Sequence, residues 1–274
     1  PYVYQVNLQT GAALPYELAT ANNWHCPAFN PARTEVAWLQ ESPEQTSLLL
    51  TTPQGTDPAR VATHDDLLNL QWSPTGDALA YTALSDDDPL FRDLIIYTDG
   101  NNQSIWPRTA GLVADYVWVP ESDDLIVAYW TQDHAIVGRL EAACWAQTET
   151  CTPTILAEFP HRTTPVITSA FANDGSALFI ILEDSRPDGS LVTNIYQVDV
   201  LAGGAQSLTA SPDLYKSGLV GDDQALYFVG TRFNAETFAF EDNALYRLVP
   251  GQDVVMPVYQ AEDFFPLDII RLAR

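Results

Sequence analysis

The sequence predicts an all-β protein made of repeated four-stranded antiparallel units. Three observations lead to this fold class. Short windows with the pattern strand, tight turn, strand recur along the chain. Each is followed by a second pair of apolar segments around a turn that contains Gly or Asp. No long stretch has the apolar spacing of an amphipathic helix, so the units are expected to consist of strands.

The first half of each unit is a ten-residue window, and five such windows align without a gap. Each opens on a large apolar residue, continues through a polar turn of Pro, Asn, Asp or Gly, and ends in an apolar run. Turn residues supply the dihedral angles of a tight turn, and aromatic and β-branched residues suit a buried pleated surface. The windows are Phe29–Trp38, Trp72–Tyr81, Trp118–Val127, Phe171–Ile180 and Leu219–Phe228.

The second half of each unit reads as two further strands around a turn. The starts of the five windows are 43, 46, 53 and 48 residues apart. A period of about 45 residues is that of a four-stranded propeller blade. The segments that show the second half are Ser47–Thr63, Asp93–Thr109, Asn194–Thr209 and Ala244–Gln260.

The two ends of the chain complete the pattern. Val3–Thr20 is similar to Asn194–Thr209, and Leu267–Leu272 reads as one more inner strand. We therefore expect one domain, residues 1–274, forming a six-bladed β-propeller closed by strands from both termini. A five-bladed propeller with irregular ends is the alternative. In the six-bladed arrangement the sixth blade, 1–20 with 264–274, has three strands unless residues lie beyond an end. The other blades are expected at about 24–63, 67–109, 113–158, 165–209 and 214–260.

Two units contain further recurrent residues. In the first half these are Trp72, Ser73, Pro74, Thr75 and Gly76, and in the second half Ile195, Tyr196, Asp199, Gly203, Gly204, Leu208 and Thr209. They resemble the Pro-Asp-Gly repeat of the TolB-type, WD40-like propeller family, in which Asp is usual at the position of Thr75. The resemblance implies a six-bladed propeller located outside the cytoplasm, and it transfers no catalytic residues because the repeat is a folding signature.

Composition excludes several partners. The chain of 274 residues has 36 acidic and 12 basic side chains, a net charge of −24, which argues against nucleic acid and anionic lipid. Eleven of the basic residues are Arg and one is Lys216. No stretch is long and apolar enough to span a membrane. The chain starts at Pro1, so we expect a processed or partial product, and a signal or anchor ahead of it fits this expectation.

The three cysteines bear on the compartment. Cys144 and Cys151 flank six residues at the tip of the outer hairpin of the third unit, and we expect a disulfide between them. Two free thiols are the alternative. A disulfide indicates an oxidising compartment. Cys26 is left over and is expected to be a buried thiol, with a partner in an unseen segment as the alternative. A His25–Cys26 metal site is disfavoured because adjacent strand residues point to opposite faces.

Catalytic motifs are missing from the sequence. There is no Gly-x-Ser-x-Gly elbow, and His25, His64, His134 and His161 lie in different units without metal-ligand spacing. A propeller glycosidase would need carboxylates on the inner strands, which are apolar here. We therefore expect neither catalytic residues nor an organic cofactor.

Acidic turns are the remaining candidates for a ligand site. Asp86, Asp87 and Asp88 are candidate Ca²⁺ ligands in the second unit, because carboxylate oxygens are hard ligands. Acidic turns also occur at Glu121–Asp124 and Gly221–Asp223. None has the alternating Asp spacing of a calcium loop, so solvated turns are the alternative. The sequence thus predicts a non-catalytic, extracytoplasmic platform for other protein subunits. A peptide- or glycan-binding module, the appendage of an enzyme whose catalytic domain is absent from this sequence, is the second hypothesis.

Overall fold

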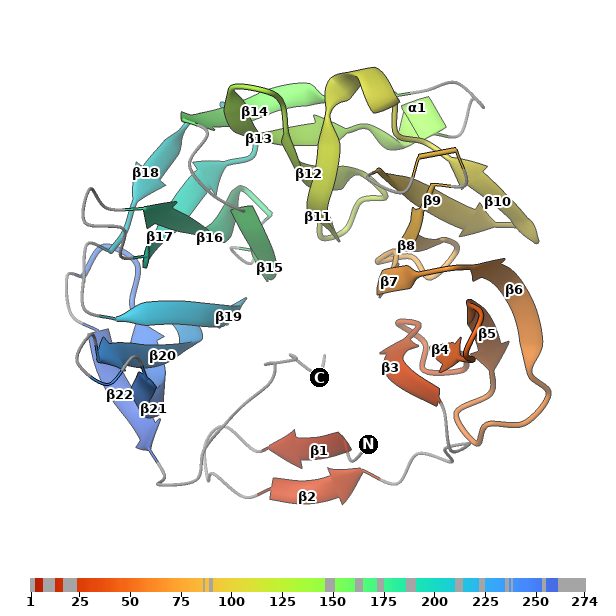
Figure 1. Cartoon of the computed structure of the whole chain (residues 1–274), viewed down its shortest axis with the longest axis horizontal. Helices are drawn as coiled ribbons and strands as arrows, with labels where there is room; N and C mark the ends of the chain where they lie inside the picture. Colours follow the sequence, from red (N-terminus) through yellow and green to blue (C-terminus); the bar gives the residue numbers. More distant parts are fainter. Residues whose placement is uncertain are drawn as a thin grey trace. The chain divides into compact units, whose positions relative to one another are not determined.

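The computed structural model describes most of the chain, and most of the described residues lie in β-strands (Figure 1). It forms two compact units, residues 1–108 with 143–151 and 272–274, and residues 109–142 with 152–271. Among the described residues no helix is long and apolar enough to cross a membrane. The described residues are 3–6, 13–16, 24–85, 87–88, 91–145, 151–160, 165–171, 175–185, 191–209, 214–221, 225–234, 237, 239–252 and 255–260.

The first unit contains a two-stranded sheet and two four-stranded antiparallel sheets, which we call sheets one and two. In each four-stranded sheet the strands follow one another in chain order. The two-stranded sheet pairs β1 (Val3–Val6) with β2 (Ala13–Tyr16). Sheet one is β3 (Trp24–Phe29), β4 (Val36–Glu41), β5 (Thr46–Thr51) and β6 (Ala59–His64). Sheet two is β7 (Leu67–Trp72), β8 (Leu79–Leu84), β9 (Arg92–Thr98) and β10 (Asn101–Ser104), followed by the short 3₁₀ helix η1 (Arg108–Ala110).

The second unit contains three more four-stranded antiparallel sheets of the same order, sheets three to five. Sheet three is β11 (Leu112–Trp118), β12 (Leu125–Trp130), β13 (His134–Leu140) and β14 (Thr154–Pro160). The short helix α1 (Ala142–Trp145) follows β13 in the chain, and its residues 143–145 belong to the first unit. Sheet four is β15 (Pro165–Phe171), β16 (Ala177–Ser185), β17 (Leu191–Asp199) and β18 (Ala205–Ser207). Sheet five is β19 (Tyr215–Gly221), β20 (Leu226–Asn234), β21 (Ala239–Leu248) and β22 (Val255–Gln260).

The repeated windows form the first hairpin of each sheet, so the predicted pattern of strand, turn and strand is confirmed. The pairs Phe29–Val36, Trp72–Leu79 and Trp118–Leu125 close three of these hairpins at the same spacing. In sheet five pairing continues to Gly221 and Leu226, which makes this turn two residues shorter. The five windows align without a gap in sequence, yet the turn in the fifth window is shorter.

Apolar side chains bury the faces between consecutive sheets within each unit. Leu39 of sheet one and Tyr81 of sheet two share one core in the first unit. In the second unit Val137 and Leu178 share a core of sheets three and four, and Ile181 and Phe228 one of sheets four and five. Tyr81 is buried, which raises the pKa of its phenol, and its hydroxyl donates to Asn102 Oδ1 at 3.0 Å. Burial of aliphatic and aromatic groups is thus the main source of stability.

The first strand of every four-stranded sheet contains a shift in register. In the first unit the shifts lie between His25 and Ala28 and between Leu68 and Gln71. Cys26 and Asn69 lie within them and have φ values of 50° and 57°. A bulge places an extra residue in one strand and interrupts the alternation of inward and outward side chains. The other shifts lie at Val113/Asp115, Val166/Ala170 and Ser217/Leu219.

The predicted strand Leu267–Leu272 lies outside the described residues.

Candidate functional site

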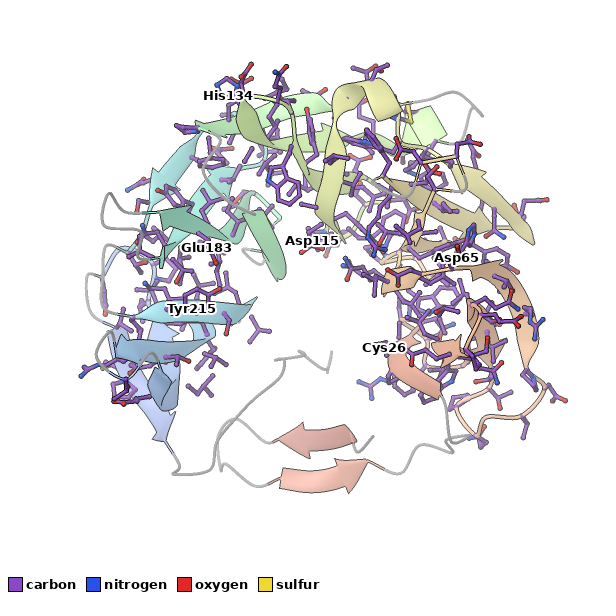
Figure 2. All side chains as sticks on the ribbon, viewed as in Figure 1. Cys26, Asp65, Asp115, His134, Glu183 and Tyr215 are labelled. Carbon is purple, nitrogen blue, oxygen red and sulfur yellow. A yellow bond between two sulfur atoms is a disulfide. The ribbon has the colours of Figure 1, made fainter. Side chains whose placement is uncertain are left out.

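A cluster of polar side chains lies where sheets four and five meet in the second unit. It consists of Glu183 on β16, Thr193 on β17, and Tyr215 and Lys216 at the start of β19. We call it the Tyr215–Lys216 cluster. Figure 2 labels two of its members, Glu183 in sheet four and Tyr215 in sheet five. The Tyr215 hydroxyl donates a hydrogen bond of 2.8 Å to Glu183 Oε2.

Lys216 is the buried member of this cluster, with 1% of its surface exposed. Its Nζ donates to the carbonyl oxygens of Thr193 at 2.6 Å and Leu214 at 2.9 Å. Its backbone N–H donates to the hydroxyl of Thr193. Burial disfavours the charged ammonium and lowers the pKa of Lys216 to about 8. The side chain thus fastens β17 to the start of β19.

The chemistry of the cluster follows from these contacts. Burial, followed by the hydrogen bond and the charge of Glu183, raises the pKa of Tyr215 to about 12, so the phenol stays neutral at physiological pH. The Lys216 amine is too deeply buried to attack a substrate from solvent. We therefore assign the cluster a structural role. The sequence held one signal for it, a single lysine among twelve basic residues, but no local pattern marks its burial.

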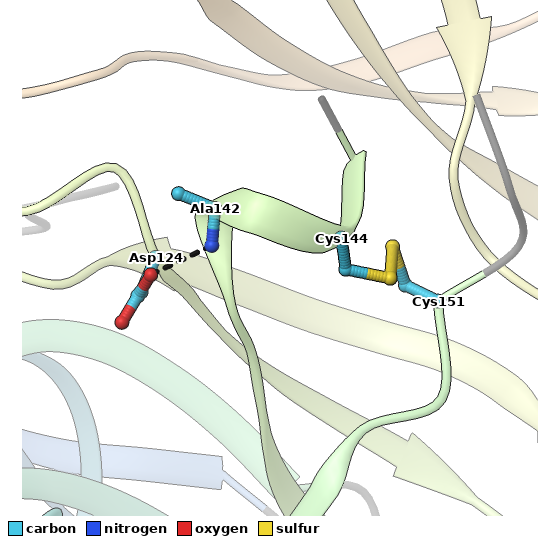
Figure 3. Close-up of a disulfide and its surroundings, with 4 residues drawn as sticks. All are labelled: Asp124, Ala142, Cys144 and Cys151. Carbon is cyan, nitrogen blue, oxygen red and sulfur yellow. Dashed lines mark hydrogen bonds between the residues drawn. A yellow bond between two sulfur atoms is a disulfide. The ribbon is translucent and has the colours of Figure 1, made fainter. Parts of the chain in front are cut away.

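A second polar contact involves one of the acidic turns. Asp124 follows the turn after β11 and is 8% exposed, so it is not the solvated turn residue that the sequence suggested. Its carboxylate accepts from Arg139 Nε at 2.9 Å and from Arg139 Nη2. It also accepts from the backbone N–H of Ala142 at 2.7 Å, at the first residue of α1 (Figure 3). Asp124 therefore holds the end of β13 and the start of α1 against its own turn.

The structure contains a disulfide between Cys144 and Cys151, with Cα atoms 5.6 Å apart (Figure 3). Cys144 lies on α1, and Cys151 lies in the segment before β14. The disulfide therefore joins a short helix to a loop at the tip of the predicted outer hairpin, and neither cysteine lies on a strand. Cys151 is buried, and its N–H donates to the carbonyl oxygen of Ile105 at 3.2 Å.

Cys26 corrects another expectation. The sequence suggested a buried thiol, but the side chain is exposed. The reason is the register shift of β3, which places Cys26 at φ 50° outside the regular alternation of the strand. A one-residue bulge of this kind has no clear sequence signature.

Two of the three candidate calcium ligands, Asp87 and Asp88, are described, and they lie between β8 and β9. Asp87 is exposed and Asp88 is half-buried, while Asp86 lies outside the described residues. Within the part of the chain that the structure describes, no three His, Cys, Asp or Glu side chains gather in a way that could hold a metal ion.

Of the four histidines, the structure describes the side chains of His64 and His134. His134 is exposed on β13 and His64 is half-buried on β6. His161, the side chain of His25, and Asp222 and Asp223 of the last acidic turn lie outside the described residues.

Comparisons with known proteins agree with this architecture. No family model matches the sequence, and no curated protein matches it. The putative TolB from Agrobacterium tumefaciens is similar in structure, with a TM-score of 0.64 and 14% identity over 93% of this chain and 87% of that one. The β-propeller domain of the trilobed protease from Pyrococcus furiosus has a TM-score of 0.60 and 12% identity over 98% of this chain and 78% of that one.

A structure of the nidogen/laminin complex contains a further similar chain, with a TM-score of 0.57 and 14% identity over 88% of this chain and 89% of that one. The chain spans 53% of TolB from Acinetobacter baumannii and 41% of an acylaminoacyl peptidase, which are also similar in structure. Likeness at such low identity carries no function. What it shows is that the sheets of this chain have the fold of β-propeller domains.

Proposed function

We propose that this chain is a non-catalytic β-propeller that serves as an interaction platform for other protein subunits outside the cytoplasm. The observation that carries the proposal is that the buried polar and charged side chains described above make contacts within the fold. Lys216, the Tyr215–Glu183 pair and the Asp124–Arg139 pair each join strands or turns of the scaffold. Sheets stiffened in this way present exposed turns, where binding residues usually lie.

The compartment is part of the proposal. A disulfide between Cys144 and Cys151 persists in an oxidising environment and is rare in the cytosol. The Pro-Asp-Gly type of repeat and the structural likeness to TolB proteins support the same location.

We also propose a six-bladed ring in a single domain, residues 1–274. Five four-stranded sheets account for residues 24–260, and the segment 3–20 is similar in sequence to the outer half of sheet four. Residues 1–20 and 264–274 would then share the sixth blade. Closure of this kind removes exposed sheet edges. Five blades with irregular ends remain the competing arrangement.

The second candidate is a peptide- or glycan-binding module that serves an enzyme. It is favoured by the similarity to the propeller domain of a protease. Titration of the purified chain with peptide and oligosaccharide libraries, followed by calorimetry, separates the two candidates. Saturable binding of a short peptide or glycan supports the module, because a subunit platform needs a folded partner.

The platform itself is tested by cross-linking in the envelope fraction of the source organism. The tagged chain is recovered, and the mass of the complex is measured by light scattering. We expect a stoichiometric complex with another protein. Recovery of a free monomer, with no cross-linked partner, would contradict the proposal.

Two matched variants test which end of the four-stranded sheets contacts the partner protein. Glu44→Lys changes an exposed residue between β4 and β5, and Asp77→Lys changes an exposed residue between β7 and β8. Glu44 follows the second strand of sheet one and Asp77 follows the first strand of sheet two, and in an antiparallel sheet the turns after the first and the second strand lie at opposite ends. We expect one variant to weaken partner recovery about tenfold, a loss of about 1.4 kcal/mol, and the other to leave it unchanged.

A further inference from the structure

We propose that the junction of sheets four and five contains an amine-binding site, which the chain fills with its own Lys216. A chain without this side chain is expected to bind a small primary amine in its place. The proposal concerns the scaffold and is independent of which partner the protein binds.

The geometry of the site is that of a receptor for an amino group. Two carbonyl oxygens, those of Thr193 and Leu214, accept hydrogen bonds from Nζ at 2.6 and 2.9 Å. They come from different segments, one from β17 and one from the residue before β19. An amino group carries at least two N–H donors whether it is charged or neutral, so it can serve both carbonyls at once. A hydroxyl has one donor and can serve only one.

Hydrogen bonds hold both the backbone and the side-chain amine of Lys216 in place. The backbone N–H of Lys216 donates to the Thr193 hydroxyl, while Nζ donates to the Thr193 carbonyl. Thr193 and Lys216 are each 1% exposed, so water has little access to the carbonyls. Buried acceptors that lose their donors destabilise the folded chain. The site therefore requires a donor group that fits its two carbonyls.

The identity of the residue fits this requirement. Every other basic residue of the chain is Arg, and lysine occurs once, at this site. A guanidinium is planar and has five donors in a rigid fork, whereas the amino group is compact. The surrounding core is apolar, with Ile195 and Leu214 among its buried residues. The junction thus has room for a narrow aliphatic stem that ends in a small donor.

Chemical rescue tests the proposal. Lys216→Ala keeps Cβ and removes a fragment that corresponds to n-propylamine. We expect the variant to melt at lower temperature than the wild type. Adding n-propylamine at about ten times its dissociation constant should raise its Tm by about 3 °C. Wild type and Lys216→Met, in which a side chain fills the site, should shift by less than about 1 °C.

The uncharged probe 1-propanol provides the matched ligand control, since it has the same chain length and one donor. A rescue by 1-propanol equal to that by n-propylamine, or no rescue by either, would overturn the proposal. So would a Lys216→Met variant as stable as the wild type, because its carbonyls would then need no donor. If Lys216→Ala is unfolded in buffer, recovery of its β-sheet circular dichroism in n-propylamine alone supports the site, and failure to recover refutes it.

Discussion

The backbone N–H of Gly204 donates a hydrogen bond of 2.7 Å to the carbonyl oxygen of Leu156, which joins the outer turn of sheet four to the outer strand of sheet three. Leu156 lies at a register shift of β14. The first unit repeats this arrangement, because Asn102 of β10 donates to the carbonyl oxygen of Val61, at a register shift of β6. In both places a bulged outer strand offers a carbonyl to the next sheet.

This contact predicts a specific cost for Gly203→Ala. Gly203 has φ +77°, and an added Cβ would lie 3.2 Å from the Leu156 carbonyl oxygen. Gly100→Ala is the matched control, since its φ is +79° and nothing lies within 4 Å of the added atom. We expect Gly100→Ala to lose about 1 kcal/mol of unfolding free energy and Gly203→Ala about 1 kcal/mol more. Urea unfolding measures both, and equal losses would show that the contact is unimportant.

Asp124→Asn should destabilise the protein. The substitution removes the charge that pairs with Arg139 and weakens the acceptor for the Ala142 N–H. Because 30% of the Arg139 side chain is exposed, solvent screens part of this ion pair, and we expect a loss of about 1–2 kcal/mol of unfolding free energy. The exposed neighbour Glu121 supplies a control, and Glu121→Gln should stay within about 0.5 kcal/mol of the wild type. A double-mutant cycle with Arg139→Met isolates the pair, and a coupling energy near zero would refute it.

The three cysteines should differ in alkylation. Exposed Cys26 should react before reduction, whereas Cys144 and Cys151 should react only after it. Mass spectrometry then counts one label without reductant and three with it. Opening the disulfide should lower the unfolding free energy by about 2–3 kcal/mol, as expected for a short closed loop. Three labels without reductant would mean that the disulfide is absent in solution.

Lys216 predicts the pH dependence of stability. Its pKa is about 8 in the folded chain and 10.5 when unfolded, so between these values the unfolded chain binds more protons. The unfolding free energy contributed by this residue therefore rises from pH 8 to 10.5. The raised pKa values of Tyr215 and Tyr81 oppose this above pH 10, where unfolded tyrosines ionise. Subtracting the profile of Lys216→Met cancels the tyrosines, and a flat difference would contradict the assignment.

Much of the fold could be predicted from the sequence because its signals are local. Turn residues and apolar runs in Trp72–Tyr81 and its four counterparts specify a hairpin through a few neighbouring residues. Their spacing indicated repeated four-stranded sheets, and the similar structures share the propeller fold. The tighter turn at Gly221 and the bulge at Cys26 escaped prediction, since a register is set by pairing across strands.

The burial and the partner of an acidic turn residue could not be predicted from the sequence. By itself the sequence determined an all-β chain with a strongly negative charge, and it marked Asp124 only as part of an acidic turn. Tertiary structure decided that Asp124 is buried against Arg139, and that Lys216 meets Thr193 at a distance of 23 residues along the chain. Such contacts join separate segments whose approach depends on how whole sheets pack. For that reason only the tertiary structure identifies the buried polar contacts of this protein.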